Sequence, residues 1–231
     1  MTPKILSVNV SLPKEVDYEG QRVVTSIFKK PIEGHIMLRT LNLDGDKQAD
    51  LTVHGGPDKA VYSYPIEHYE FWRKVYPNME ISNGMFGENF TTEGLMEYEV
   101  NVGDIFKIGS SKVIATQPRM PCYKLGVKFG RMDVLKKFLA SGRPGIYFKV
   151  LEEGEVGVGD QIVQIKKDPN RIGISDIVRL YTSDRENIKM MKLAVKVKAL
   201  PEGWKQYFLE QIRRLERKQP SMNKNRNQRQ A

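Results

Sequence analysis

The stretch VGDIFKIGSSKVIATQPRMPCYKLG (residues 102–126) joins two strand-like segments to a proline-bracketed loop. β-Branched and aromatic residues are frequent in 104–109 and 111–117, which predicts two strands separated by a glycine-containing turn. Pro118 and Pro121 then follow, and because proline fixes the backbone φ angle, the loop between them should be stiff. The loop leads directly to the only cysteine of the 231-residue chain.

Strand-like segments recur between turn residues throughout 1–168. The further segments are 4–10, 21–28, 59–64, 145–152 and 160–165. The strings VNVGDIFKI (100–108) and VGVGDQIVQI (156–165) resemble each other, which indicates one turn-into-strand arrangement used twice. Many short strands without a regular alternation with helices predict a mainly β fold, either a barrel or a folded-over sheet.

Two helices are expected within this β-rich part. Apolar residues recur at helical spacing in 65–76 and in 131–142. The second helix should stop at Gly142, because glycine readily adopts the left-handed conformation that ends many helices.

After the polar segment 166–171 the strand-like pattern is replaced by short helix-like segments, which predicts a domain boundary. We expect a β domain over 1–168, a three-helix domain over 169–219 and a flexible basic tail over 220–231. In SDRE (183–186), Ser183 and Glu186 have the spacing of a capping box at a helix start. The last helix carries Trp204 and Phe208 on one stripe, for which packing is the simplest role and docking of a partner the alternative.

Composition limits the class of protein. One cysteine allows no internal disulfide, the N-terminus has no signal-peptide pattern, and no segment has the apolar length of a membrane span. These features predict a cytoplasmic protein that is not bound to a membrane. The net charge of +9 favours anionic ligands, but no aromatic residues interleave the charges of the tail, which disfavours nucleic-acid binding.

Cys122 is the first candidate for chemistry. A lone cysteine is most simply a small buried hydrophobe. Here, however, Arg119 and Lys124 lie close in the sequence, and nearby cations favour the thiolate that attacks electrophiles and binds metals. A single thiolate cannot hold a metal tightly, so a metal at Cys122 should arrive already chelated by a cofactor.

Two glycine-rich loops are further candidates. The first contains His54, Gly55, Gly56 and Lys59, and its backbone N–H groups could form an anion site. The alternative is a simple hairpin turn with an exposed histidine.

The second loop, NGMFGENFTTEGL (83–95), contains Gly87, Glu88 and Asn89, whose side chains could bind a ligand. The alternative is a β-turn with an asparagine cap. If both loops are functional, they should meet Cys122 in one cleft.

Taken in order, the strings His-Gly-Gly, Gly-Glu-Asn and Pro-Arg-x-Pro-Cys resemble the MOSC family, named after the C-terminal domain of molybdenum cofactor sulfurase. The resemblance covers about 44–165, and the helical end resembles the extension of a bacterial branch that is similar to proteins protecting cells against N-hydroxylated purines. It implies a β-barrel-like fold that binds molybdenum cofactor, with Cys122 as metal ligand and catalytic residue.

The resemblance also implies roles for the other candidates. Cofactor-binding residues would be His54, Gly55, Gly56, Lys59, Gly87, Glu88, Asn89 and Arg119. Pyridoxal phosphate is disfavoured because the chain has no room for an aminotransferase-like domain beside the MOSC region.

The function that the resemblance implies is reduction of N-hydroxylated compounds, such as hydroxylamino purines, to amines. Electrons should come from a separate reductase, because no flavin, haem or NAD motif is evident. Two alternatives stay open: sulfur transfer through a Cys122 persulfide, and a non-catalytic cofactor carrier. A homodimer also stays open.

Overall fold

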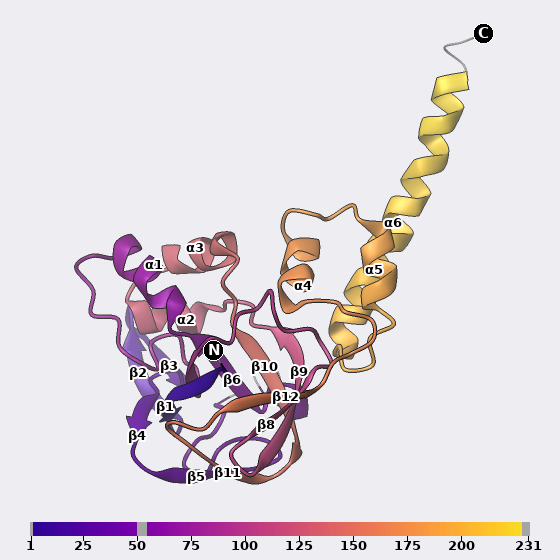
Figure 1. Ribbon diagram of the computed structural model, residues 1–231. Helices are drawn as coiled ribbons and strands as arrows, with labels where there is room; N and C mark the ends of the chain where they lie inside the picture. Colours follow the sequence, from indigo (N-terminus) through magenta and orange to yellow (C-terminus); the bar gives the residue numbers. More distant parts are fainter. Residues whose placement is uncertain (1, 50–54, 228–231) are drawn as a thin grey trace.

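An eight-stranded sheet forms the centre of the computed structural model, which describes residues 2–49 and 55–227, with side chains as far as Lys218. Its strand order is β12-β8-β9-β10-β6-β7-β1-β4 (Figure 1). The bounds are β1 Lys4–Val10, β4 Lys30–Ile32, β6 Val61–Pro65, β7 Phe90–Glu93, β8 Ile105–Ile108, β9 Ser111–Pro118, β10 Ile146–Glu152 and β12 Ile162–Lys166.

The sheet curls but is not closed into a barrel. Strands β12 and β4 are its two edges, and a single bridge joins Lys4 to Gln161. Beside this bridge, Ile5 N donates to Asp160 O (3.0 Å) and Ile162 N donates to Pro3 O (2.7 Å). The predicted mainly β fold is confirmed, with an open, folded-over sheet as its form.

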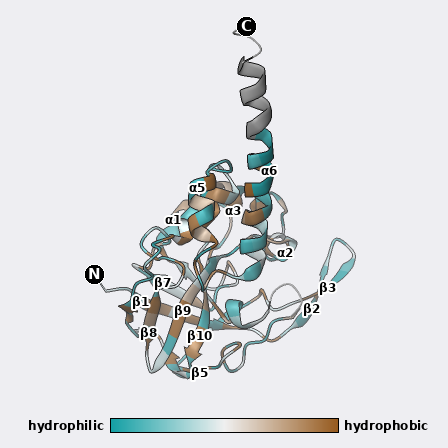
Figure 2. Ribbon diagram, turned by 90° about the vertical axis from the view of Figure 1, so that its right-hand side faces the viewer, coloured by the Kyte–Doolittle hydropathy of each residue, from teal (hydrophilic) through white to brown (hydrophobic). Residues whose placement is uncertain are grey.

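Two short ribbons complete the β structure. Strand β5 (His35–Leu38) pairs with β11 (Gly154–Gly157), and β2 (Lys14–Tyr18) pairs with β3 (Gln21–Thr25). Figure 2 shows the β2–β3 hairpin projecting from the body, while strands of the main sheet are largely hydrophobic.

The repeated Gly-Asp turn is confirmed in detail. Gly103 and Gly159 both have positive φ angles, of 96° and 90°. In each turn the following aspartate accepts a hydrogen bond from the backbone three residues back: Asn101 N to Asp104 Oδ2 (2.9 Å) and Gly157 N to Asp160 Oδ2 (2.8 Å). This side-chain bond gives both turns the same geometry before strands β8 and β12.

Three helices gather on one side of the molecule. They are α1 (Glu67–Val75), α2 (Tyr123–Phe129) and α3 (Asp133–Ser141), and they pack around an aromatic cluster that includes Tyr64, Trp72, Phe86 and Phe138. The expected helices correspond to α1 and α3, and Gly142 ends α3 with φ of 64° as predicted. Helix α2 was not expected from the sequence.

The C-terminal helices α4 (Ile174–Tyr181), α5 (Ile188–Ala194) and α6 (Glu202–Asn227) pack against the sheet, with α4 in contact with β9. Phe208, Met191 and Ile177 belong to the same buried cluster as Ile108 and Phe148 of the sheet. The two parts of the chain therefore share one hydrophobic core. None of the described helices is long and apolar enough to cross a membrane.

One prediction about these helices was wrong. Asn187, not Ser183, caps α5: its Oδ1 accepts a hydrogen bond from Met190 N (2.9 Å). Ser183 N instead bonds to Arg179 O, so this residue still closes the end of α4. Helix α6 continues past Pro220 to Asn227, because a proline removes one helical hydrogen bond without necessarily ending the helix. The flexibility of the basic tail over 220–231 stays a prediction.

We expect Phe208→Ala to destabilise the whole protein. The side chain is fully buried in the shared core, and truncating a buried phenylalanine costs about 3–5 kcal/mol. Urea unfolding followed by circular dichroism and by tryptophan fluorescence should show one lowered transition by both probes. Tyr98→Ala, at a side chain that is 68% exposed, is the control and should change stability by less than about 0.5 kcal/mol. Loss of the helices alone, with the sheet unchanged, would contradict a shared core.

Candidate functional site

Cys122 lies between the end of β9 and the start of α2, and Leu125 N donates to its carbonyl oxygen (2.9 Å). The residue is half-buried and lines a cavity of about 90 Å³, which we call the thiol cavity. Arg119 and Gly87 line it too. The other lining residues are Thr25, Ser26, Ile27, Lys29, Lys47, Gln48, Ala49, Lys124 and Tyr147.

Arg119 is a buried cation in the wall of the thiol cavity. It is 7% exposed, and its guanidinium lies over the Tyr62 ring, 5.0 Å from the centroid. Its buried Nη1 has no hydrogen-bond partner among the described residues. Burial acts to lower the pKa of Arg119, but Tyr62, Tyr147 and Cys122 together raise it, so the group stays charged. A buried charged donor without a partner is costly unless a ligand satisfies it.

Lys124, which the sequence places beside Cys122, also lines this cavity, together with Ser26 and Lys29, which the sequence did not indicate. Lys124 is 8% exposed, and the buried Ser26 Oγ has no hydrogen-bond partner among the described residues. Lys29 forms an ion pair with the buried Asp46, and burial lowers its pKa although Asp46 acts against this. Ser26 and Lys29 reach the cavity only through contacts between distant segments, so no local motif could have identified these two residues.

The Glu88 side chain stabilises the glycine loop through hydrogen bonds to its backbone. Its fully buried carboxylate accepts hydrogen bonds from the Tyr69 hydroxyl, Gly84 N (2.7 Å), Phe86 N (2.9 Å) and Thr91 Oγ1 (2.9 Å). Burial nevertheless raises the pKa of Glu88. The carboxylate is thus used within the protein, and it does not line the thiol cavity.

Asn89 has a similar supporting place. Its Oδ1 accepts from Tyr62 N (3.1 Å), and its Nδ2 donates to Asp46 Oδ2 (2.8 Å). Nδ2 also donates to Asn9 O of β1 (3.3 Å), so the amide joins β6 and β1 as well as the loop that carries Asp46, and the side chain does not line the cavity. Of this loop, Gly87 is the residue that meets Cys122.

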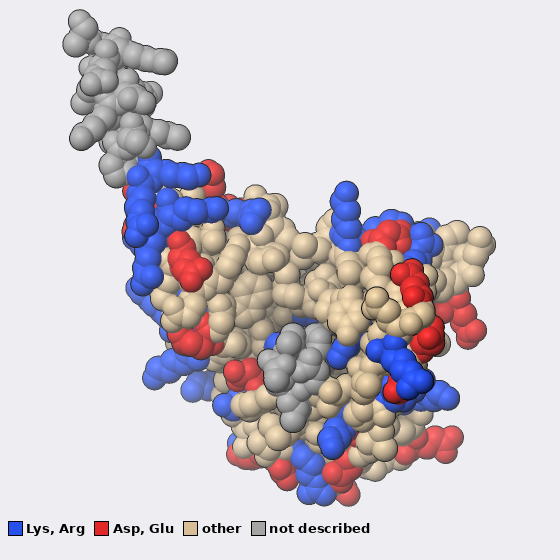
Figure 3. Space-filling view, turned by 180° about the vertical axis from the view of Figure 1, so that it is seen from behind, with Lys and Arg blue, Asp and Glu red and all other residues tan. Residues whose placement is uncertain are grey.

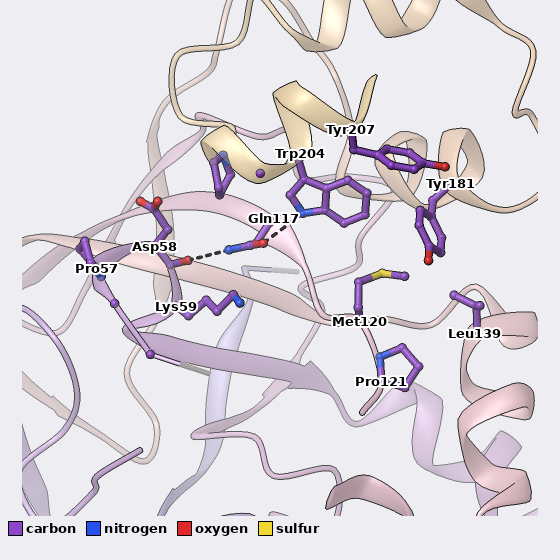
Figure 4. A pocket seen from close by; sticks show the side chains of 14 residues that line it. Pro57, Asp58, Lys59, Gln117, Met120, Pro121, Leu139, Tyr181, Trp204 and Tyr207 are labelled. Carbon is purple, nitrogen blue, oxygen red and sulfur yellow. Dashed lines mark hydrogen bonds between the residues drawn. The ribbon is translucent and has the colours of Figure 1, made fainter. Parts of the chain in front are cut away.

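The other glycine loop lines a second, larger cavity of about 700 Å³, which we call the aromatic pocket (Figure 4). His54 lies outside the described residues, but Gly55, Gly56 and Lys59 line this pocket. Burial lowers the pKa of Lys59, while Asp58 and Cys122 act against the shift, so the ammonium group is within electrostatic reach of the thiol.

The described residues thus form two cavities where the sequence predicts one cleft. The thiol cavity and the aromatic pocket lie on either side of Pro121 and Cys122, since Pro121 lines one and Cys122 the other. In Figure 3 a hollow separates the part carrying α6 from the part carrying α1–α3. Among the described residues, no group of three or more His, Cys, Asp or Glu side chains is placed to hold a metal ion.

Comparisons with known proteins agree on one family. The family model of the MOSC domain matches residues 50–163. The chain is 39% identical over 211 residues to the uncharacterized protein YflK of Bacillus subtilis, covering 91% of this chain and 95% of that protein. It is 27% identical over 175 residues to a protein named Reductase from Gibberella moniliformis, covering 74% of this chain but 31% of that protein.

The fold is also similar to a solved structure. The crystal structure of YiiM from Geobacillus stearothermophilus superimposes with a TM-score of 0.77 at 32% identity. The match covers 91% of this chain and 99% of that one, so it includes the C-terminal helices as well as the sheet.

We expect Gly87→Ala to distort the thiol cavity. Gly87 has φ of 72°, and an added Cβ would come 2.8 Å from Ile27 Cγ1 and 3.6 Å from Arg119 Nη1. Gly34→Ala is a matched control, because Gly34 has φ of 77° but no atom within 4 Å of an added Cβ. Thermal unfolding should show a loss for Gly87→Ala that exceeds the control by about 1–3 kcal/mol, the range for overpacking. Equal losses of stability in the two variants would mean that Ile27 can shift to accommodate the added methyl group.

Proposed function

The chain belongs to the MOSC domain family, and on this premise we propose that it binds a molybdenum cofactor through Cys122 and reduces N-hydroxylated compounds to amines. The observation that carries the proposal is a half-buried thiol in one cavity with a buried guanidinium whose Nη1 has no hydrogen-bond partner among the described residues. The name of the Gibberella moniliformis relative supports a reductase, although this chain spans under a third of that protein.

The residues of the thiol cavity fit an anionic cofactor that carries its own metal. Cys122 would provide one soft ligand, as suits a metal already held by a dithiolene. Arg119 and Ser26 present buried donor atoms that lack partners within the described residues, and Lys124 adds a cation. These groups would bind the anionic parts of the cofactor, while Glu88 and Asn89 hold the Gly87 turn beside them.

The reaction consumes two electrons and two protons: R–NHOH + 2e⁻ + 2H⁺ gives R–NH₂ + H₂O, with cleavage of the N–O bond. When bound, the cofactor would supply the two-electron chemistry. The chain would orient the substrate and exclude water. Lys59 Nζ is suited to donating a proton to the leaving hydroxyl, since burial lowers its pKa and it lies within electrostatic reach of Cys122. The electrons would come from a separate reductase.

The test is the metal and pterin content of protein made in cofactor-producing cells and purified without oxygen. We expect stoichiometric molybdenum and pterin in the wild type and less than about a tenth of this in Cys122→Ser. Arg119→Met should lower cofactor affinity about 10–100-fold, as removal of a supporting group does in metal sites. Arg39→Met, at an exposed arginine paired with Asp44, is the matched control and should retain the cofactor.

Two outcomes would overturn the proposal. A persulfide on Cys122 without molybdenum would indicate sulfur transfer. Bound cofactor without reduction of a hydroxylamino purine, in the presence of a competent electron donor, would indicate a carrier.

A further inference from the structure

The aromatic pocket has a wall that the proposed cofactor does not use. Trp204 and Tyr207 of α6 and Tyr181 of α4 lie together, with ring centroids 5.4–6.2 Å apart (Figure 4). Trp204 Nε1 donates to Gln117 Oε1 (3.0 Å), which fixes the indole relative to β9. The rings are not coplanar, because Trp204 stands at 84° to Tyr181 and at 88° to Tyr207, so they offer the pocket both faces and edges. Aromatic faces and edges both attract planar rings, and nucleobases are such rings.

One end of the pocket is close to the thiol. Met120 and Pro121, the residues directly before Cys122, form part of its lining, together with Lys59. A ring stacked against Trp204 would therefore have Met120 and Pro121 on one side and Lys59 on the other (Figure 4).

The pocket continues past Leu139 and Tyr181 into a second groove. Leu139 and Tyr181 line both the aromatic pocket and a groove of about 800 Å³ between α3 and α4. Lys136, Arg179 and Arg185 line this groove beside Ser and Thr hydroxyls, and no acidic side chain is among its lining residues in the described chain. We call it the basic groove.

Two of the three cations in the basic groove are available to a ligand. Arg179 is engaged by Asp176 (3.4 Å) and Asp184 (3.5 Å). Within the described residues, Lys136 and Arg185 form no ion pair with an acidic side chain. A ligand that reaches from the aromatic wall past Tyr181 thus ends beside two unpaired cations, which suits a phosphate group.

We propose that these two adjoining cavities bind a nucleotide, with the base against Trp204 and Tyr181 and the phosphate at Lys136 and Arg185. The assignment of this nucleotide as the substrate rests on the proposed function: an N-hydroxylated base would direct its N–O group toward Cys122 and its phosphate away from it. The enzyme would then act on nucleotides in preference to free bases. A free base would leave the basic groove unfilled.

The test is binding of adenine, adenosine and adenosine 5′-monophosphate, the amine forms of such substrates, to the full chain without cofactor. Trp204 provides the signal, because Trp72 is fully buried and far less open to a ligand. We expect the monophosphate to quench tryptophan emission and to bind at least about tenfold tighter than adenosine. Trp204→Leu should abolish the quenching, and Tyr181→Leu, checked for its fold by circular dichroism, should weaken all three ligands about tenfold.

The double variant Lys136→Ala, Arg185→Ala should remove the preference for the monophosphate and leave adenosine binding unchanged. Lys189→Ala, at an exposed lysine of α5 outside both cavities, is the matched control and should keep the preference. Equal affinity for adenosine and its monophosphate would overturn the inference, as would tighter binding of an oligonucleotide. Because this assay needs no metal, its result is independent of the metal and pterin analysis. A preference for the monophosphate, combined with no molybdenum in protein from cofactor-producing cells, would refute the proposed function alone. Stoichiometric molybdenum combined with no preference for the monophosphate would refute the nucleotide alone.

Discussion

The buried carboxylate of Glu88 is the interaction on which the site depends. It joins α1 through Tyr69, the 84–86 backbone and β7 through Thr91, and so holds the turn that places Gly87 beside Arg119. It also contributes the negative potential that stabilises the charged forms of Lys29 and Lys128. A single carboxylate with no exposure thus supports both the shape of the thiol cavity and its positive charge.

The stiff loop after β9 separates the thiol cavity from the aromatic pocket. On one side, Cys122 and Arg119 face a small, strongly basic cavity suited to an anionic, metal-bearing group. On the other side, Met120 and Pro121 face a larger pocket with an aromatic wall. Because prolines at 118 and 121 restrict the backbone, the same short segment can keep the two sides at constant separation. The arrangement brings a cofactor and a planar substrate to neighbouring positions without mixing their binding groups.

The C-terminal helices belong to this arrangement as much as the sheet does. Phe208 anchors α6 in the core shared with β8 and β10, and Trp204, one turn earlier, reaches Gln117 at the end of β9. The helix that completes the hydrophobic core therefore also builds the pocket wall. A change in the packing of α6 should be felt at the site, because both depend on the same turn of helix.

The sequence by itself determined the features that depend on local conformational preference. These are most of the strands, the paired Gly-Asp turns, the helices α1 and α3, the cap at Gly142 and the stiff, positively charged setting of Cys122. It also indicated Gly87, because glycine tolerates the positive φ angle that the turn requires. Tertiary structure alone decided which polar groups face a cavity. Glu88 and Asn89 turned inward to support the sheet, whereas Ser26 lines the cavity with the thiol. For Asn89 and Trp204 the contacts join segments 80 or more residues apart, Asn89 with Asn9 and Trp204 with Gln117, and no local pattern encodes them. For Glu88 the partners are nearer in the chain, but they converge only when α1, the 84–86 turn and β7 are folded together.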